Sequence, residues 1–185
     1  YTTFEKKIDS MIDNGDTLAL TVSVTNTGKA AGRDVIELYY TPPYTNGGIE
    51  KASVNLIDFA KTSVIQPGAS ELIYFLLDKR DMASYDYSGV KVAGGGYILE
   101  AGEYAVSVRS DSHTICDAQT FTVTSDIRYD EQAVNRFDSA RGTHTVLSRA
   151  DGFANYAEAC AAPDESAYVM DDETHDAVAA NTVSG

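Results

Sequence analysis

The sequence has few cysteines and no long apolar run, so neither a framework of disulfides nor a membrane helix is expected to hold this protein. Its 185 residues include no tryptophan and two cysteines, Cys116 and Cys160. Two cysteines cannot form the framework of several bridges that holds small secreted domains, and their spacing matches no zinc motif, so we expect two free thiols. No apolar run approaches the roughly 20 residues that cross a bilayer as a helix.

A signal peptide is also missing from the sequence. Residues 1–4 lack the basic and apolar segments of such a leader, and the chain does not begin with methionine. We therefore expect an internal fragment of a longer polypeptide. Without a signal peptide or a disulfide framework, the sequence favours a cytoplasmic location.

Basic side chains are scarce. The chain carries 14 Lys and Arg against 28 Asp and Glu, for a net charge of −14. Residues 126–185 contain no lysine and are the more acidic part per residue. An acidic surface repels the phosphates of nucleic acids and of anionic lipids. We therefore expect neither a nucleic acid nor a membrane as partner.

What the sequence does contain is hydrophobicity with a period of two residues. Residues 17–25 place leucines and valines at even positions and threonines, alanine and serine at odd ones, as in a half-buried strand. Residues 33–41 continue the pattern, with Ile36, Leu38 and Tyr40 on one face. Further strands are predicted at 53–59, 61–65, 70–77, 102–110 and 119–124.

The spacing of these strands predicts the fold class. About seven short strands are separated by turn signals every 8–15 residues, and no long segment has a helical period. This pattern is typical of an all-β antiparallel sandwich over residues 1–125 and excludes a βαβ fold. Between the strands, Asp78 is a plausible N-cap for a short helical turn. Residues 85–98 contain three consecutive glycines and are expected to form a hairpin or a wide loop.

The pattern changes after residue 125. Residues 126–149 are expected to be a linker with a short helix near 129–140 and a possible strand at 143–148. Residues 150–185 are rich in alanine and acidic residues and contain few large apolar ones. Alone, they could not bury enough surface to offset the entropy of ordering them. We expect an acidic, Ala-rich linker or disordered tail, or a piece that packs on a domain absent here. The extension should thus be mostly irregular.

Several blocks of sequence resemble one known family. The segment TLALTVSVTNTGKAAGRDVIELYYTPP is similar to the fibronectin-type-III-like domain of glycoside hydrolase family 3, the β-glucosidase family. The segments LIDFAKTSVIQPGAS, LDKRDMASYD and EAGEYAVSVRSDSH follow in the family's order. The resemblance covers residues 1–125 and implies an immunoglobulin/fibronectin-III-like sandwich. The later segment NRFDSARGTHTVLSRADGFAN resembles the connection toward a catalytic barrel in domain-permuted members.

The resemblance implies a non-catalytic domain that braces the catalytic domains of the same polypeptide. The parent would hydrolyse β-glycosidic bonds with no cofactor. We find neither the family's nucleophilic aspartate nor its acid/base carboxylate, because AYVMDDETH lacks the residues that flank the nucleophile. We therefore predict no catalytic residue.

Two other clusters of reactive side chains are interpreted as structural or solvated. The acidic run 171–173 with His175 could bind a hard cation, but such runs usually stay solvated, and we predict no metal site. His113 and Cys116 lack the pocket that a nucleophile requires.

The tyrosines leave a second function open. Sugar rings stack on exposed aromatic faces, and oligosaccharide is a possible partner, although tyrosine also fills cores and domain interfaces, and tryptophan is missing. A stand-alone carbohydrate-binding module and a protein-interaction module therefore remain alternatives. The loops at 42–52 and 86–97 are the best places for contacts with a neighbouring domain or substrate. The substrate-contact candidates are Tyr44, Asn46, Tyr85, Tyr87 and Tyr97.

Overall fold

The computed structural model describes residues 1–129 and 145–162. The chain divides into two compact units, Tyr1–Thr143 and His144–Gly185. The first unit holds the strands described below, and the second holds two short helical turns.

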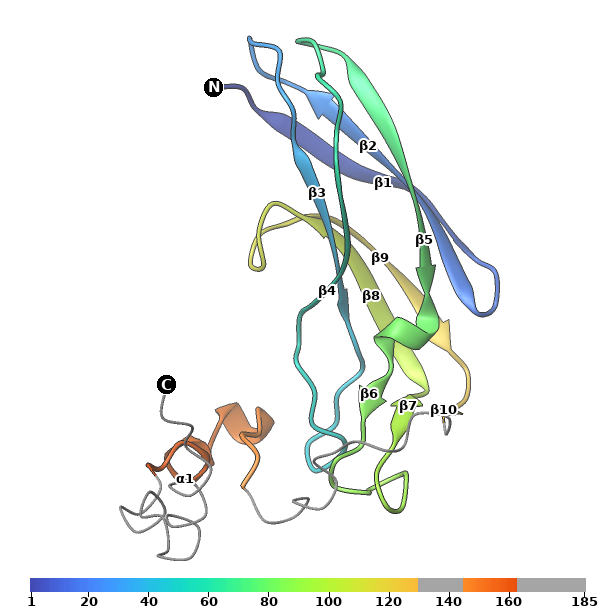
Figure 1. Cartoon of the computed structure of the whole chain (residues 1–185), viewed down its shortest axis with the longest axis vertical. Helices are drawn as coiled ribbons and strands as arrows, with labels where there is room; N and C mark the ends of the chain where they lie inside the picture. Colours follow the sequence, from blue (N-terminus) through green and yellow to red (C-terminus); the bar gives the residue numbers. More distant parts are fainter. Residues whose placement is uncertain (130–144, 163–185) are drawn as a thin grey trace, which may run out of the picture. The chain divides into compact units, whose positions relative to one another are not determined.

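One sheet of the first unit has three antiparallel strands in the order β1-β2-β5 (Figure 1). These are β1 (Phe4–Asp13), β2 (Thr17–Asn26) and β5 (Ser70–Asp78). In β2, even-numbered residues such as Leu18 are buried and odd-numbered ones are half-buried. The predicted period of two is therefore confirmed for this strand.

The second sheet has four antiparallel strands in the order β4-β3-β8-β9. They are β3 (Val35–Thr41), β4 (Asn55–Lys61), β8 (Gly102–Arg109) and β9 (Ile115–Val123). The inner faces of both sheets form one buried core, as expected of a sandwich. Each fully buried aliphatic side chain contributes about 1.5–3 kcal/mol relative to an exposed one. The fold class predicted from the sequence is confirmed.

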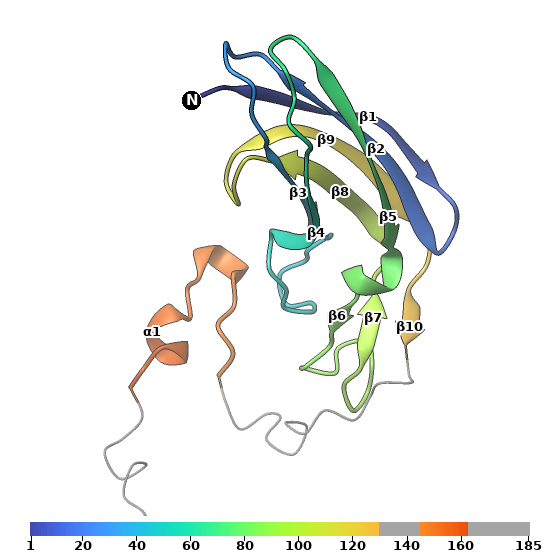
Figure 2. The ribbon, with the colours of Figure 1, turned by 45° about the horizontal axis from the view of Figure 1, so that its top comes forward.

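A third, small sheet in the order β10-β7-β6 continues beyond the end of the two main sheets (Figure 2). Its strands are β6 (Ser84–Tyr85), β7 (Tyr97–Leu99) and β10 (Ile127–Tyr129). A 3-10 turn, η1 (Lys79–Met82), leads from β5 into it. The Asp78 side chain accepts a hydrogen bond from the Arg80 N–H at 2.9 Å, so the predicted N-cap is confirmed.

A buried tyrosine fixes the start of β8. The Tyr104 side chain is 1% exposed, and its hydroxyl donates to the carbonyl of Glu100 at 3.2 Å. Its ring stacks on Phe121 with centroids 5.3 Å apart. A tyrosine at this place, bonded to backbone four residues upstream, is the tyrosine corner of immunoglobulin-like sandwiches. Burial raises the pKa of the Tyr104 hydroxyl, so it stays a neutral donor.

The Asn-Thr-Gly turn is held by a fully buried amide, that of Asn26. Its Nδ2 donates to the carbonyls of Ala30 and Ile65, each at 2.8 Å. Its Oδ1 accepts from Thr2 Oγ1 at 2.7 Å and from the Gly28 N–H at 3.0 Å. A Cβ on Gly28 would lie 2.6 Å from the Thr3 nitrogen, so only glycine fits the turn. One side chain thus joins three segments that are distant in sequence.

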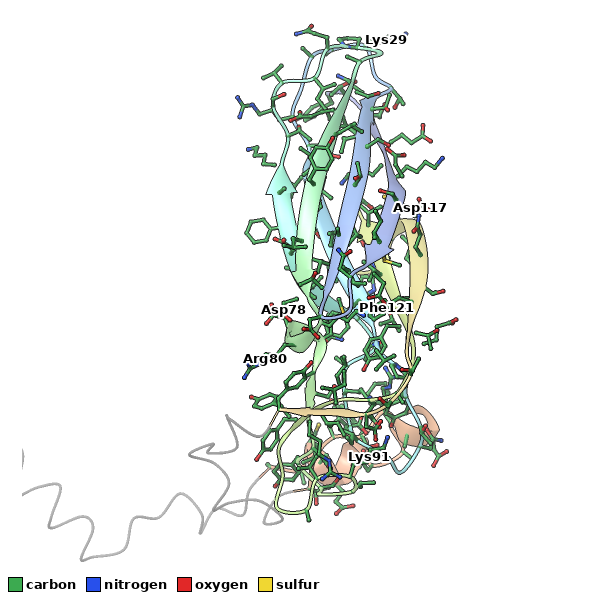
Figure 3. The ribbon with its side chains drawn as sticks, turned by 90° about the vertical axis from the view of Figure 1, so that its right-hand side faces the viewer. Lys29, Asp78, Arg80, Lys91, Asp117 and Phe121 are labelled. Atoms are coloured by element: carbon green, nitrogen blue, oxygen red, sulfur yellow. The ribbon has the colours of Figure 1, made fainter. Side chains whose placement is uncertain are left out.

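Two side chains of β9 close the side of the sandwich where β1 and β9 meet. The Ile8 N–H donates to Asp117 Oδ2 at 2.9 Å, and Gln119 Nε2 donates to the Ile8 carbonyl at 3.0 Å. Figure 3 shows Asp117 beside these strands. Side chains therefore join the two edge strands where no backbone ladder does. An edge strand left open would be available for pairing with another chain.

The sequence did not predict β1, because its alternation is hidden. Lys6 occupies a buried position and forms an ion pair with Asp34 at 3.0 Å. A bulge between Ile8 and Ser10 then shifts the register. A lysine at an inward position and an added residue both break the period of two.

The predicted strand at 61–65 was wrong. β4 ends at Lys61, and Ile65 forms only an isolated bridge with Gly32. The buried hydroxyl of Thr62 accepts from the Asp34 N–H at 2.9 Å and donates to the Ser63 carbonyl at 2.8 Å. A side-chain bond from Thr62 thus replaces part of the regular ladder beyond Lys61.

The second unit contains η4 (Ala150–Gly152) and α1 (Tyr156–Ala159). Residues 145–149 carry no strand. The Asn155 side chain donates to the Val146 carbonyl at 2.8 Å and accepts from the Ser148 N–H at 3.0 Å. The helix predicted near 129–140 and most of the predicted tail lie outside the described residues. Within 1–129 and 145–162, no helix is long and apolar enough to cross a membrane.

Candidate functional site

Two loops meet at one end of the sandwich. Residues 42–54 connect β3 to β4, and residues 86–96 connect β6 to β7. A second small core of Ile49, Val92 and Ile98 joins them, each side chain no more than 8% exposed. Figure 3 shows Lys91 of the second loop at the opposite end of the sandwich from Lys29. The structure therefore places the two loops named by the sequence side by side.

The second loop is organised around one buried carboxylate, Asp86, which is 0% exposed. Burial alone would raise its pKa, but four backbone N–H donors outweigh burial and leave the pKa below its ordinary value. The loop is therefore wrapped around a negative charge. The donors are Gly89 N and Val90 N to Oδ1 at 2.9 and 3.2 Å, and Lys91 N and Val92 N to Oδ2, both at 2.7 Å.

A row of alternating charges links the two loops to the turn after β7. Lys51 pairs with Glu100, Lys91 pairs with Glu100 at 3.0 Å, and Lys91 pairs with Asp126 at 2.9 Å. Hydrogen bonds to Asp126 and then to Glu100 raise the pKa of Lys91. The Ala101 N–H and then Lys91 lower the pKa of Asp126. Both shifts favour the charged forms of Lys91 and Asp126.

A hollow of about 330 Å³ lies between the loops. Of the five predicted contact residues, Asn46 lines it. Tyr44, on the same loop, is half-buried and donates its hydroxyl to Glu50 at 3.0 Å. The wall combines polar and apolar side chains, including Asn46, Ile49, Val90, Lys91 and Glu100.

The other three predicted contact residues lie on or next to the small sheet. The rings of Tyr85 and Tyr97 meet edge to face, with centroids 5.1 Å apart. Tyr97 also lines a hollow of about 280 Å³ with Arg80 and Tyr129, among others. The Arg80 guanidinium lies 5.4 Å from the centroid of the Tyr129 ring. Tyr87 is half-buried beside Tyr85, and its N–H donates to the Tyr85 carbonyl at 3.0 Å. Tyr44, Tyr85 and Tyr87 line neither hollow.

The remaining reactive residues are His113, which lies in a turn, and the two cysteines. Asp111 accepts the N–H groups of His113 and Thr114 at 2.8 and 2.9 Å, which lower its pKa and shape the turn before β9. Cys116 and Cys160 are free thiols, as predicted, and both are exposed. Among the residues that the structure describes, no group of three or more His, Cys, Asp or Glu could hold a metal ion.

Sequence reasoning missed Asp86, whose role depends on four donors from the following loop. The signal was present, since Asp86 is followed by Tyr87, Ser88 and Gly89, and Asp before Ser and Gly is typical of a turn closed on its own side chain. The row of charges had no such signal, because Lys51, Lys91, Glu100 and Asp126 are brought together only by the fold.

Comparison with known proteins identifies the sandwich. Residues 34–112 match the family model of the fibronectin type III-like domain. They form a fibronectin type III-like domain. The chain is 42% identical over 92 residues to β-glucosidase A of Butyrivibrio fibrisolvens, covering 50% of this chain and 11% of that protein. It is 35% identical over 125 residues to a β-glucosidase of Ruminococcus albus, covering 68% and 13%.

Solved structures agree with the sequence relatives. β-Glucosidase 3B of Thermotoga neapolitana, in complex with glucose, matches 70% of this chain and 17% of its own at a TM-score of 0.62 and 35% identity. The β-glucosidase of Kluyveromyces marxianus, also in complex with glucose, matches 70% and 15% at a TM-score of 0.61 and 28% identity. The chain therefore carries the fibronectin type III-like domain of family 3 β-glucosidases, as the resemblance implied. It spans 11–17% of the length of these relatives. The permuted domain order stays a prediction.

Proposed function

We propose that this chain is a non-catalytic structural domain of a family 3 glycoside hydrolase, in which it braces the catalytic domains of the same polypeptide. The parent hydrolyses β-glycosidic bonds. The observation that carries the proposal is the share of each chain that the structural match covers. The match takes in 70% of this chain but only 15–17% of each solved β-glucosidase. Most of such an enzyme therefore lies in other domains.

The chemistry of the loop end supports a structural role. A retaining glycosidase requires two carboxylates about 5–5.5 Å apart, one nucleophilic and one able to exchange a proton. Here the carboxylate of Asp86 is occupied by backbone N–H groups, and those of Glu100 and Asp126 are occupied by lysines. The lowered pKa values of Asp86 and Asp126 make these groups poor general acids. They are suited to holding the loops.

An activity assay tests this role. We expect the purified 185-residue chain to release no product from an aryl-β-glucoside above the buffer blank. The full polypeptide that carries it should turn the substrate over. Turnover by the 185-residue chain alone would overturn the non-catalytic assignment, and an inactive full polypeptide would overturn the assignment of the parent.

A second candidate function is direct contact with an oligosaccharide at the loop end. The hollow between the loops favours it, because Asn46, Lys91 and Glu100 offer polar groups beside the apolar Ile49 and Val90. The test is an NMR titration of the chain with glucose and cellobiose, in which saturable shifts of the amides at 46–48 and 90–91 are expected. The variant Asn46→Ala should weaken them. Shifts that stay linear up to the highest sugar concentration would exclude this function.

A further inference from the structure

The outward face of β5 is apolar between its polar ends, Ser70 and Asp78. Leu72, Tyr74 and Leu76 are 50%, 72% and 67% exposed, while the alternate residues Phe75 and Leu77 are buried in the core. Residues two apart in a strand lie on the same face, about 7 Å from each other. The three side chains therefore form a continuous ridge on the outside of the first sheet.

Beside Tyr74 and Leu76 the neighbouring strands place uncharged side chains, and charge begins only beside Leu72, where Ser23 of β2 donates to Asp9 of β1 at 3.1 Å. Across the ladder, Ala19 of β2 pairs with Leu76, and Thr21 pairs with Tyr74. Ile12 of β1 pairs with Ala19 and is 58% exposed. We call this surface the β5 face and define it by Leu72, Tyr74, Leu76, Ala19 and Ile12. Uncovered antiparallel sheets usually present polar side chains to water, so such a face marks a site of interaction.

The outer face of the second sheet is different. There Tyr39 donates its hydroxyl to Glu37 at 2.9 Å, and the Arg109 guanidinium lies 5.4 Å from the Tyr39 ring centroid. That face also exposes Leu56 and Phe59 of β4, but Phe59 lies directly opposite the charged Glu37. Apolar and charged side chains are thus mixed there, whereas Leu72, Tyr74 and Leu76 follow one another on β5 with no charged residue between them on that face.

We propose that the β5 face is the surface on which another domain of the same polypeptide docks, through a complementary apolar and uncharged surface. The inference rests on the proposed function. Most of each related β-glucosidase lies outside the part that this chain matches, so a covalently linked partner is at hand. A linked partner meets the face at an effective concentration of about millimolar, so a modest apolar patch suffices. A second copy fits less well, because two chains of net charge −14 repel each other.

Hydroxyl-radical footprinting of the unaltered protein tests the proposal. Phe59 on β4 is the internal reference, because it is 67% exposed and also lies on an edge strand. In the full polypeptide, oxidation of Tyr74 relative to Phe59 should be several-fold lower than in the 185-residue chain, at every protein concentration. An unchanged ratio would overturn the β5 face as the docking surface. Protection of Tyr74 already present in the 185-residue chain would mean that the chain's own residues cover the β5 face. If that protection were lost on dilution, a second copy would be the cover. Either result would overturn the proposal.

A pair of matched variants gives a second readout. Tyr74→Lys should lower the midpoint of thermal unfolding of this domain in the full polypeptide more than in the 185-residue chain. Phe59→Lys, the control, should have the same small effect in both proteins. An equal effect of Tyr74→Lys in both would mean that Tyr74 acts only within its own domain and would overturn the proposal. A full polypeptide without glycosidase activity overturns the proposed function instead, and leaves both readouts interpretable.

Discussion

The two ends of the sandwich are fixed by different chemistry. At one end, the neutral amide of Asn26 ties three segments together through hydrogen bonds to carbonyl, hydroxyl and N–H groups. At the other end, the buried charge of Asp86 and a row of ion pairs hold two long loops. A neutral amide is insensitive to pH and salt over the usual range, whereas carboxylates and ion pairs respond to both. We therefore expect the stability of the Asn26 end to be independent of pH and salt, and the stability of the loop end to depend on both.

The largest effect is expected from Asn26→Leu. The substitution removes four hydrogen bonds of a fully buried side chain, and the Ile65 carbonyl keeps only the Gly32 N–H as donor, at 3.1 Å. Each hydrogen bond of this kind contributes about 0.5–1.5 kcal/mol. We expect the free energy of unfolding to fall by about 3–5 kcal/mol, equally at pH 5 and pH 8. Urea unfolding measures this. Thr27→Ala, at an exposed neighbour, is the control and should cost less than about 1 kcal/mol. A loss that varies with pH would break the comparison.

Asp86→Asn should have the next largest effect. An amide offers one acceptor oxygen, and its NH₂ group would face N–H donors that the carboxylate now accepts. We expect a loss of about 2–3 kcal/mol at pH 7, with faster hydrogen exchange at residues 89–92 than in the wild type. Glu103→Gln, at an exposed site on β8, should leave both quantities unchanged. If exchange at Asn26 also accelerates, the two ends are not independent.

Acid should separate the two ends without any substitution. The pKa values of Asp86 and Asp126 are lowered in the folded chain, so their stabilising contribution is present above the unfolded pKa of about 3.9. It is lost as the pH falls from there through the lower folded values. Hydrogen exchange at 89–92 should accelerate over this window before exchange at the Asn26 end. Asp86→Asn should flatten this response, and an unaltered response in that variant would assign the acid sensitivity elsewhere.

The sequence predicted those parts of the fold that depend on neighbouring residues. β2 was found because its two faces differ in polarity, and η1 because Asp78 caps it locally. β5 was found as a strand, but its run LIYFLL is apolar on both faces, so the period of two could not show which residues point outward. β1 was missed because Lys6 points inward and is neutralised by Asp34, 28 positions further along the chain.

The candidate site was predictable only as two loops. Their residue ranges followed from turn signals, but the Ile49–Val92–Ile98 contact that joins them depends on residues more than 40 positions apart. The same holds for Asn26, whose turn was recognised although its bond to Ile65 was not. Local patterns name the segments, and long-range contacts determine which segments meet and what their side chains do there.

The smallest effect is expected from Lys91→Met, which removes the lysine shared by Glu100 and Asp126. Lys91 is about one-third exposed, and ion pairs of this kind contribute about 1 kcal/mol or less. We expect a loss of about 0.5–1 kcal/mol at low salt that shrinks in 1 M NaCl, where charges are screened over about 3 Å. Asp86→Asn should show no such salt dependence, because backbone N–H donors and not ions are its partners. Equal salt dependence of the two variants would show that the loop end is held by its surface charges and not by the buried carboxylate.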